Sequence, residues 1–194
     1  MITLPTFRGN NIRSWPKHAE GGFAKYLALK EILSSDFPTD VHFAQYENPQ
    51  VTRRLCDDIL KPDRAAELAR IGGTVRMVVI VFDVDVPGHG DLTEAWTDNE
   101  VSKIGRLNQP FVYFTRHGYR IVQLLADPFL IDSKSAATRW TDFYLQSCAY
   151  LSRVHEIHAD PVGDWQRLFR APHATRDEGG KPERLPFVGE INGV

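Results

Sequence analysis

One stretch decides the fold of this chain: Val78-Val79-Ile80-Val81-Phe82-Asp83-Val84-Asp85-Val86. It is an apolar run rich in β-branched residues, which is typical of a strand buried in the middle of a sheet. Successive side chains of a strand point to opposite faces, so Asp83 and Asp85 must point the same way. The sequence therefore predicts a central strand that delivers two carboxylates to one edge of a sheet.

The aspartate pair indicates a metal site. Two carboxylates this close on one face repel each other, and each raises the pKa of the other unless a cation lies between them. Hard oxygen ligands suit Mg²⁺ or Mn²⁺, ions that also hold phosphate oxygens, so the pair favours phosphoryl chemistry. A solvated turn with surface ion pairs is the alternative that the pair alone leaves open.

Length and composition describe one ordinary globular domain. The chain has 194 residues, of which 42% are hydrophobic and 25% are charged, with a formal net charge of −2. These values are those of a water-soluble protein with a substantial core. The near-neutral charge argues against a uniformly basic nucleic-acid-binding surface, but it leaves room for a local basic patch.

Cysteine usage and hydropathy narrow the class further. Cys56 and Cys148 lie far apart and form no Cys-x-x-Cys pair, so neither a disulfide framework nor a zinc site is indicated. No apolar stretch approaches the roughly 20 residues that cross a bilayer, and the first residues lack the pattern of a secretory signal. We therefore expect a cytoplasmic protein with no membrane partner.

The rest of the chain mixes helical and extended patterns. Apolar residues at helical spacing predict helices over residues 23–33, 63–71, 92–108 and, the longest, 133–154. Extended patterns predict strands over 41–46, 111–115 and 119–125, the last two joined as a hairpin. This order lacks the regular alternation of a doubly wound sheet. It predicts an α+β fold with a mixed, largely antiparallel sheet flanked by helices.

Two further polar segments accompany the aspartate pair. The hairpin Thr115-Arg116-His117-Gly118-Tyr119-Arg120 supplies cations and a hydroxyl that suit nucleotide phosphates, because arginine binds phosphate oxygens through paired donors. The segment from Asp160 to His173 adds a third acid and the string Arg167-Leu168-Phe169-Arg170-Ala171-Pro172. Taken singly, each segment is also compatible with a solvated turn or with surface ion pairs.

Together, and in this order, the three segments resemble the catalytic domain of the archaeo-eukaryotic primase superfamily, especially the primase-polymerases of plasmids and phages. The resemblance spans about Val78 to Thr175, and the Arg167–Pro172 string is its most distinctive part. It implies a single domain over residues 1–194, with an N-terminal αβ part over about 1–75 and an RRM-like catalytic part over about 76–190.

The resemblance implies a function as well as a fold. The function is template-directed nucleotidyl transfer, as a DNA primase or DNA polymerase, in replication or repair of a plasmid, phage or prokaryote. The ligands implied are nucleoside triphosphates and a DNA template with its primer, and a helicase or a C-terminal helical primase domain is a further expected partner.

The resemblance also implies roles for individual positions. Asp83, Asp85 and Asp160 match the catalytic acids that hold two divalent ions, Mg²⁺ or Mn²⁺. The nucleotide-binding positions implied are Thr115, Arg116, His117, Gly118, Tyr119, Arg120, Arg167 and Arg170. Arg120 stands where the family usually has histidine, so either Arg120 or His117 is expected to bind the phosphates. Asp164 is an alternative to Asp160, and its structural role would be a loop hydrogen bond.

Several consequences and alternatives follow from these assignments. Removing Asp83 or Asp85 is expected to abolish incorporation while leaving the fold mostly intact. Tyr119, Trp165 and Phe169 are candidates to stack on bases, with core packing favoured for Phe169.

Two other functions stay open on the sequence. A haloacid dehalogenase-type phosphotransferase also uses an apolar strand and Asp-x-Asp, with the first acid as nucleophile, but it places the motif near the start of a parallel sheet. About 80 residues precede the motif here. A non-catalytic domain that binds nucleotide or DNA also stays open, because Arg120 stands where the family usually has histidine.

Overall fold

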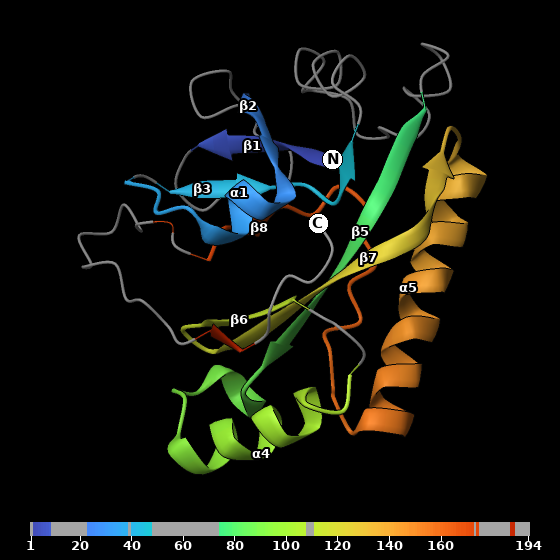
Figure 1. Ribbon diagram of the computed structural model, residues 1–194. Coiled ribbons are helices and arrows are strands. Elements are labelled where there is room, and N and C mark those ends of the chain that lie inside the picture. The colour runs from blue at the N-terminus through green and yellow to red at the C-terminus, as the bar shows by residue number, and fades with distance from the viewer. Residues whose placement is uncertain are drawn as a thin grey trace.

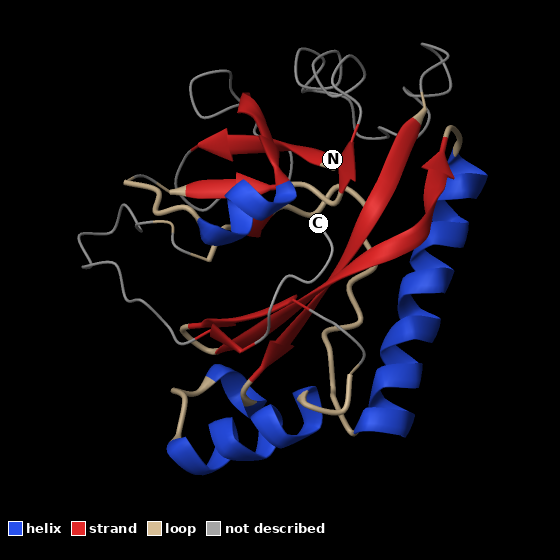
Figure 2. Ribbon diagram, in the orientation of Figure 1, coloured by secondary structure: helices blue, strands red, loops and turns tan. Residues whose placement is uncertain are grey.

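The computed structural model describes residues 2–8, 23–38, 40–47, 74–107, 111–172, 174 and 187–188 (Figures 1 and 2). The elements in chain order are β1 (Thr3–Arg8), β2 (Phe23–Ala28), α1 (Leu29–Ser34), β3 (Val41–Phe43), β4 (Tyr46–Glu47), β5 (Val75–Asp85), the short 3₁₀ turn η2 (Pro87–His89), α4 (Glu94–Ile104), β6 (Phe111–Thr115), β7 (Gly118–Ile131), α5 (Lys134–His155), β8 (Phe169–Arg170) and β9 (Phe187–Val188).

The described strands form two antiparallel sheets. The small sheet has the order β2-β1-β3-β8, and the large sheet has the order β4-β5-β7-β6-β9. In the large sheet β5 pairs with β7 along almost its whole length, from Val75 opposite Ile131 to Asp85 opposite Gly118. Antiparallel sheets with helices confirm the α+β class that the sequence predicts.

One face of the large sheet is covered by helices. Ile80 and Phe82 of β5 belong to a core cluster that also contains Trp140 and Tyr144 of α5 and Ile104 of α4. The rings of Phe82 and Tyr144 lie 5.4 Å apart. Figure 1 shows α5 running beside β5 and β7, with α4 below them. This face carries the apolar, alternate residues of the strand and no part of the aspartate pair.

The opposite face of the large sheet packs against the small sheet. Val79 and Val81 of β5 share a second core cluster with Leu4 of β1 and Phe43 of β3. Asp83 and Asp85 continue the same alternate set of residues, so their side chains face the side on which the small sheet lies. The prediction that both acids share one face is confirmed, and the two sheets together surround the candidate site.

The long helix α5 agrees with its sequence pattern. It begins after Ser133, whose Oγ accepts a hydrogen bond from the Ala136 backbone N–H at 3.2 Å, and it ends at Glu156 in the left-handed conformation, with φ of 59°. Its buried residues recur about every four positions: Ala136, Trp140, Tyr144, Cys148 and Leu151. Helical periodicity was sufficient here because the helix packs with one face only.

Three local predictions have different outcomes. The helix predicted over 23–33 is wrong in its first half, because Phe23–Ala28 pairs with β1 as a strand and only Leu29–Ser34 is helical. The strand predicted over 41–46 is two strands, β3 and β4, that belong to different sheets. The helix predicted over 63–71 lies outside the described residues. No helix among the described residues is long and apolar enough to span a membrane.

Candidate active site

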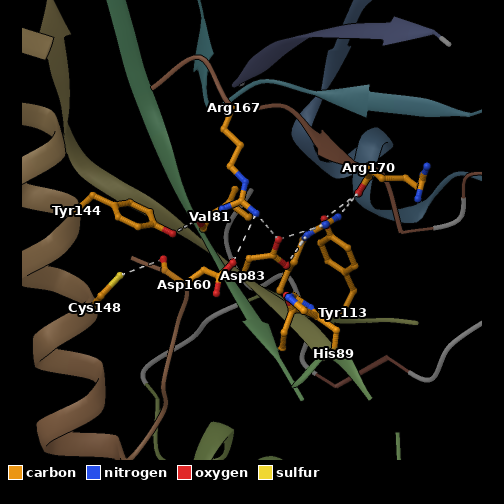
Figure 3. Close-up of polar contacts among 11 residues, drawn as sticks. Val81, Asp83, His89, Tyr113, Tyr144, Cys148, Asp160, Arg167 and Arg170 are labelled. Atoms are coloured by element: carbon orange, nitrogen blue, oxygen red, sulfur yellow. Dashed lines mark hydrogen bonds and ion pairs between the residues drawn. The ribbon is translucent and has the colours of Figure 1, made fainter. Parts of the chain in front are cut away.

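Asp83 lies at the centre of the candidate site, near the end of β5 (Figure 3). Its Oδ1 accepts a hydrogen bond from Arg120 Nε at 3.0 Å, and its Oδ2 accepts from Arg167 Nη2 at 2.7 Å and from Arg120 Nη2 at 3.4 Å. The Asp83 side chain is only 6% exposed. A carboxylate buried to this degree requires paired charge, and two guanidinium groups supply it.

The register of the large sheet places Arg120 on Asp83. Arg120 of β7 lies directly opposite Asp83, and Tyr113 of β6 lies directly opposite Arg120, so the three residues share one face. The Arg120 guanidinium lies over the rings of Phe169 and Tyr113, 5.5 and 6.0 Å from their centroids. Tyr113 Oη donates to the Arg170 carbonyl at 2.9 Å. Aromatic rings and backbone thus hold Arg120 in a fixed position.

Arg167 reaches the site from the segment between α5 and β8. Its guanidinium lies 5.3 Å from the centroid of Phe169 and 4.0 Å from Asp160 Oδ2, in addition to its bond to Asp83. Its buried Nη1 has no hydrogen-bond partner among the described residues. Arg167 therefore connects two of the acids and retains one donor for a further acceptor.

Asp160 is attached to β5 through the backbone. Its N–H donates to the Asp83 carbonyl at 2.8 Å, which joins the segment after α5 to the strand of the acids. The Asp160 carboxylate is 40% exposed, and Figure 3 shows it beside Asp83. The third acid predicted from the sequence thus lies in the same cluster as the first two, although about 75 residues of chain separate it from them.

Asp85 differs from Asp83 in its surroundings. Its side chain is 21% exposed, and its ion-pair contact is with His89 Nδ1, 3.2 Å from Oδ2. Burial, followed by the negative charges of Asp83 and Asp160, raises the pKa of the Asp85 carboxyl. His89 has a left-handed backbone, with φ of 53°, and its ring lies against Asp85 four residues earlier. Asp85 therefore lies where negative charge is in excess.

The turn of the β6–β7 hairpin lies beyond Asp85. His117 O accepts a hydrogen bond from Val86 N–H at 2.7 Å, and His117 Nδ1 is 3.2 Å from Gly90 O. Thr115 is half-buried and Arg116 is exposed. These residues border the Asp85 end of the site, and His117 is held by the loop that follows β5 rather than by the acids.

Gly118 and Tyr119 have structural roles in this arrangement. A Cβ on Gly118 would lie 1.9 Å from Val84 O and 2.8 Å from the Cα of Asp85, so glycine is required for β7 to approach β5 here. Tyr119 points to the helix face, is fully buried, and donates through Oη to Glu100 Oε2 at 2.8 Å. The expectation that Tyr119 contacts a nucleotide is corrected, because alternation along β7 places it opposite to Arg120.

Arg170 also differs from its expected role. Its Nε and Nη2 donate to Asp40 Oδ1 and Oδ2 at 2.7 and 2.8 Å, and Asp40 is buried. Figure 3 shows the Arg170 side chain extending away from Asp83. Its carbonyl oxygen accepts from Arg120 Nη1 at 3.3 Å and from Tyr113. Arg170 therefore supports Arg120 through its backbone, and its guanidinium is used to bind Asp40.

The remaining candidates in this segment have structural roles. Asp164 is exposed, and its Oδ1 accepts from Gln166 N–H at 2.9 Å, which is the loop hydrogen bond expected for its structural role. Trp165 and Phe169 are buried in the two core clusters. Stacking of Trp165 on a base is thus corrected to core packing, and core packing of Phe169 is confirmed.

Comparison with known protein families, with curated proteins and with solved structures finds no match for this chain.

Asp83 and Asp85 differ in how well they suit the divalent metal ions that the sequence predicts. Among the described residues, no three His, Cys, Asp or Glu side chains are grouped so as to hold a metal ion. Asp83, with both oxygens bonded to guanidinium groups, does not fit a metal ligand. Asp85 forms no ion pair with an arginine or lysine among the described residues, so its oxygens, unlike those of Asp83, are open to a hard cation.

Sequence reasoning missed three residues of the site. Asp40 comes from the chain before β3, and no local signal connects it to Arg170. Tyr113 was predictable from the hairpin register, which places it opposite Arg120. His89 stands between two glycines in the loop after the acids, and that composition is the signal that could have identified it.

Proposed function

We propose that this chain is a catalytic domain of the primase-polymerase type, which binds a nucleoside triphosphate at the Asp83 cluster and transfers its nucleotidyl group to a primer on a DNA template. One observation carries the proposal. Three segments that are far apart in the sequence place Asp83, Asp85 and Asp160 beside the guanidinium groups of Arg120 and Arg167. Carboxylates and arginines side by side are the groups that phosphoryl transfer requires.

The architecture supports the proposal at the level of the fold. An antiparallel sheet carries helices on one face, and Asp83 and Asp85 lie at the end of β5, between β4 and β7 in the strand order, on the other face. We extend the proposal to the fold of the archaeo-eukaryotic primase catalytic domain, with the small sheet as its N-terminal part and the large sheet as its catalytic part.

The two arginines are the residues that would bind the triphosphate. Arg167 already presents a buried donor without a partner among the described residues, and phosphate oxygens are its natural acceptor. Arg120 contacts the rings of Tyr113 and Phe169 and the Arg170 carbonyl in addition to Asp83. Each guanidinium has N–H donors beyond those bonded to Asp83, and these donors would bind the phosphate oxygens.

The Asp85 end of the site is where the primer hydroxyl belongs. Asp85 and Asp160 are the more exposed of the three acids, and the hairpin turn borders Asp85. A divalent ion bound there would lower the pKa of a hydroxyl and neutralise phosphate charge. The contribution of the chain is to position the reactants and to hold the opposing charges in fixed places.

Extension of a labelled primer on a DNA template tests the proposal. The assay uses Mg²⁺ or Mn²⁺, ribo- and deoxynucleoside triphosphates in separate reactions, and parallel reactions without primer. We expect template-dependent addition in the reactions with primer. Addition without primer would identify a primase. If the chain alone needs a primer, addition without primer in the presence of a helicase or a helical primase domain would identify that protein as the partner. Binding of nucleotide or DNA without any extension would contradict the proposal.

That last outcome corresponds to the second candidate function, a non-catalytic domain that binds nucleotide or DNA. The bond between Arg120 and Asp83 favours it, because an acid held by two arginines is less available for chemistry. The haloacid dehalogenase-type alternative gains no such support. The strands on both sides of β5 are antiparallel to it, whereas that class uses a parallel sheet.

A further inference from the structure

The bonds of Asp83 leave little room for a cation. Three guanidinium nitrogens lie within 3.4 Å of its two oxygens, and they come from two arginines on different elements. A carboxylate offers about four lone-pair positions, so most of them are occupied. A divalent ion at Asp83 would also stand next to two positive groups that rings and backbone hold in place.

Arg120 is the position at which this chain differs from the histidine expected in the primase-polymerase family. It lies directly across the sheet from Asp83, so its guanidinium approaches the carboxylate without a bend in either strand. Tyr113, Phe169 and the Arg170 carbonyl surround it. A histidine at this position would be shorter, would present two N–H groups at most, and would carry a charge that depends on pH, so it would not hold Asp83 through the fixed paired donors of a guanidinium.

The two arginines leave Asp85 unoccupied by a strong cation. No arginine or lysine among the described residues forms an ion pair with it, and its contact is with the exposed ring of His89. Asp83 lies two residues away on the same face of β5, and the Asp160 backbone is bonded to the Asp83 carbonyl, so two further carboxylates lie in this part of the chain. The positive charge of Arg120 and Arg167 is therefore concentrated at Asp83, and Asp85 has no comparable partner among the described residues.

We propose that the guanidinium groups of Arg120 and Arg167 take the place of one metal ion at Asp83, so that the site accepts a single divalent ion, at Asp85. This inference rests on the proposed function and changes its metal content from two ions to one. It also assigns Arg120 a role that histidine cannot fill, namely fixed positive charge at the acid that would otherwise bind the second ion.

Titration of the purified chain with Mn²⁺ alone, followed by the electron paramagnetic resonance signal of the unbound ion, tests the inference. We expect one bound ion per chain. Asp85→Asn should lose that ion, and Arg120→His should bind a second one. Arg139→His, the same substitution on the exposed face of α5, is the control and should bind one ion. No bound ion or two bound ions in the unaltered chain would overturn the inference.

Anomalous diffraction from crystals of the unaltered chain soaked in Mn²⁺ keeps the test independent of any variant's folding. We expect a single peak beside Asp85, and a peak within ligand distance of Asp83 would overturn the inference. Primer extension by the same preparation separates the two proposals. Two bound ions together with primer extension would support the proposed function and contradict the single-ion inference. One bound ion without primer extension would support the inference and contradict the proposed function.

Discussion

Asp83 and Asp85 stand two residues apart on one strand and face the same way, yet their surroundings are opposite. Asp83 is 6% exposed and bonded to two arginines, whereas Asp85 is 21% exposed and has an exposed histidine as its contact. The Asp-x-Asp motif is common to both. Cross-strand partners and depth in the sheet therefore set the role of each acid, and Asp83 combines a structural role with any chemical one.

The largest effect is expected for Asp83→Ala. It leaves Arg120 and Arg167, with side chains 18% and 21% exposed, without their carboxylate. Removal of one partner from a buried ion pair costs about 3–5 kcal/mol of unfolding free energy. Urea denaturation measures this cost, with Asp85→Ala as the matched variant that should lose little. Equal losses of unfolding free energy in the two variants would contradict the distinction between the acids. A large loss for Asp83→Ala would limit the sequence-based expectation of an intact fold to the removal of Asp85.

A smaller loss is expected for Gly118→Ala, which acts at the Asp85 end. The added Cβ would meet Val84 O at 1.9 Å, so β7 must move away from β5 beside Asp85. Overpacking of this kind costs about 1–3 kcal/mol. Gly90→Ala is the control, because its nearest atom, Val86 Cγ1, is 3.6 Å away and its φ of −68° suits alanine. Thermal unfolding that does not distinguish the two variants would contradict the close approach of the strands.

Tyr113→Phe tests the support of Arg120 on the Asp83 side. The substitution removes the 2.9 Å hydrogen bond to the Arg170 carbonyl and keeps the ring beneath the guanidinium. We expect a loss of about 0.5–1.5 kcal/mol, the usual net contribution of one hydrogen bond. Tyr150→Phe, on a ring that is 52% exposed, should be neutral in the same denaturation experiment. An unchanged unfolding free energy for Tyr113→Phe would contradict a stabilising role for the Tyr113 hydroxyl.

The smallest effect is expected for Asp85→Asn. Because the pKa of Asp85 is raised in the folded chain, the folded state binds this proton more tightly than the unfolded state, and stability falls as pH rises from the unfolded to the folded pKa. Asp85→Asn removes that loss, so it should be slightly more stable than the unaltered chain at pH 7, with a difference that shrinks on acidification. Denaturation at several pH values measures it. A less stable variant at pH 7 would show that the charge of Asp85 is compensated within the chain.

The sequence predicted those features that depend on local pattern. The alternation of β5, the hairpin and the face of α5 follow from periodicity, and the three motifs marked Asp83, Asp85, Asp160, Arg120 and Arg167, which the fold brings together. Features that depend on distant pairing were not predictable. The pairing of residues 23–28 with β1 overrides their helical spacing. Asp40, just before β3, binds the guanidinium of Arg170 on the paired strand β8, 130 residues later in the chain.

Tyr119 illustrates the same limit within the site. The motif places it next to Arg120 in the sequence, and that neighbourhood suggested a shared ligand. A strand sends adjacent side chains to opposite faces, so Tyr119 packs against α4 and bonds to Glu100 while Arg120 reaches Asp83. A motif lists residues in order, whereas a sheet separates them into two faces.

Primer extension by matched variants tests the central claim most directly. The unaltered chain, Asp85→Asn and Asp142→Asn, an exposed acid on α5, would be compared on one labelled primer–template with Mn²⁺ and all nucleoside triphosphates. We predict template-dependent extension by the unaltered chain and by Asp142→Asn, and none by Asp85→Asn although it remains folded. Extension by Asp85→Asn at the rate of the unaltered chain would contradict the account, as would the absence of extension from all three proteins.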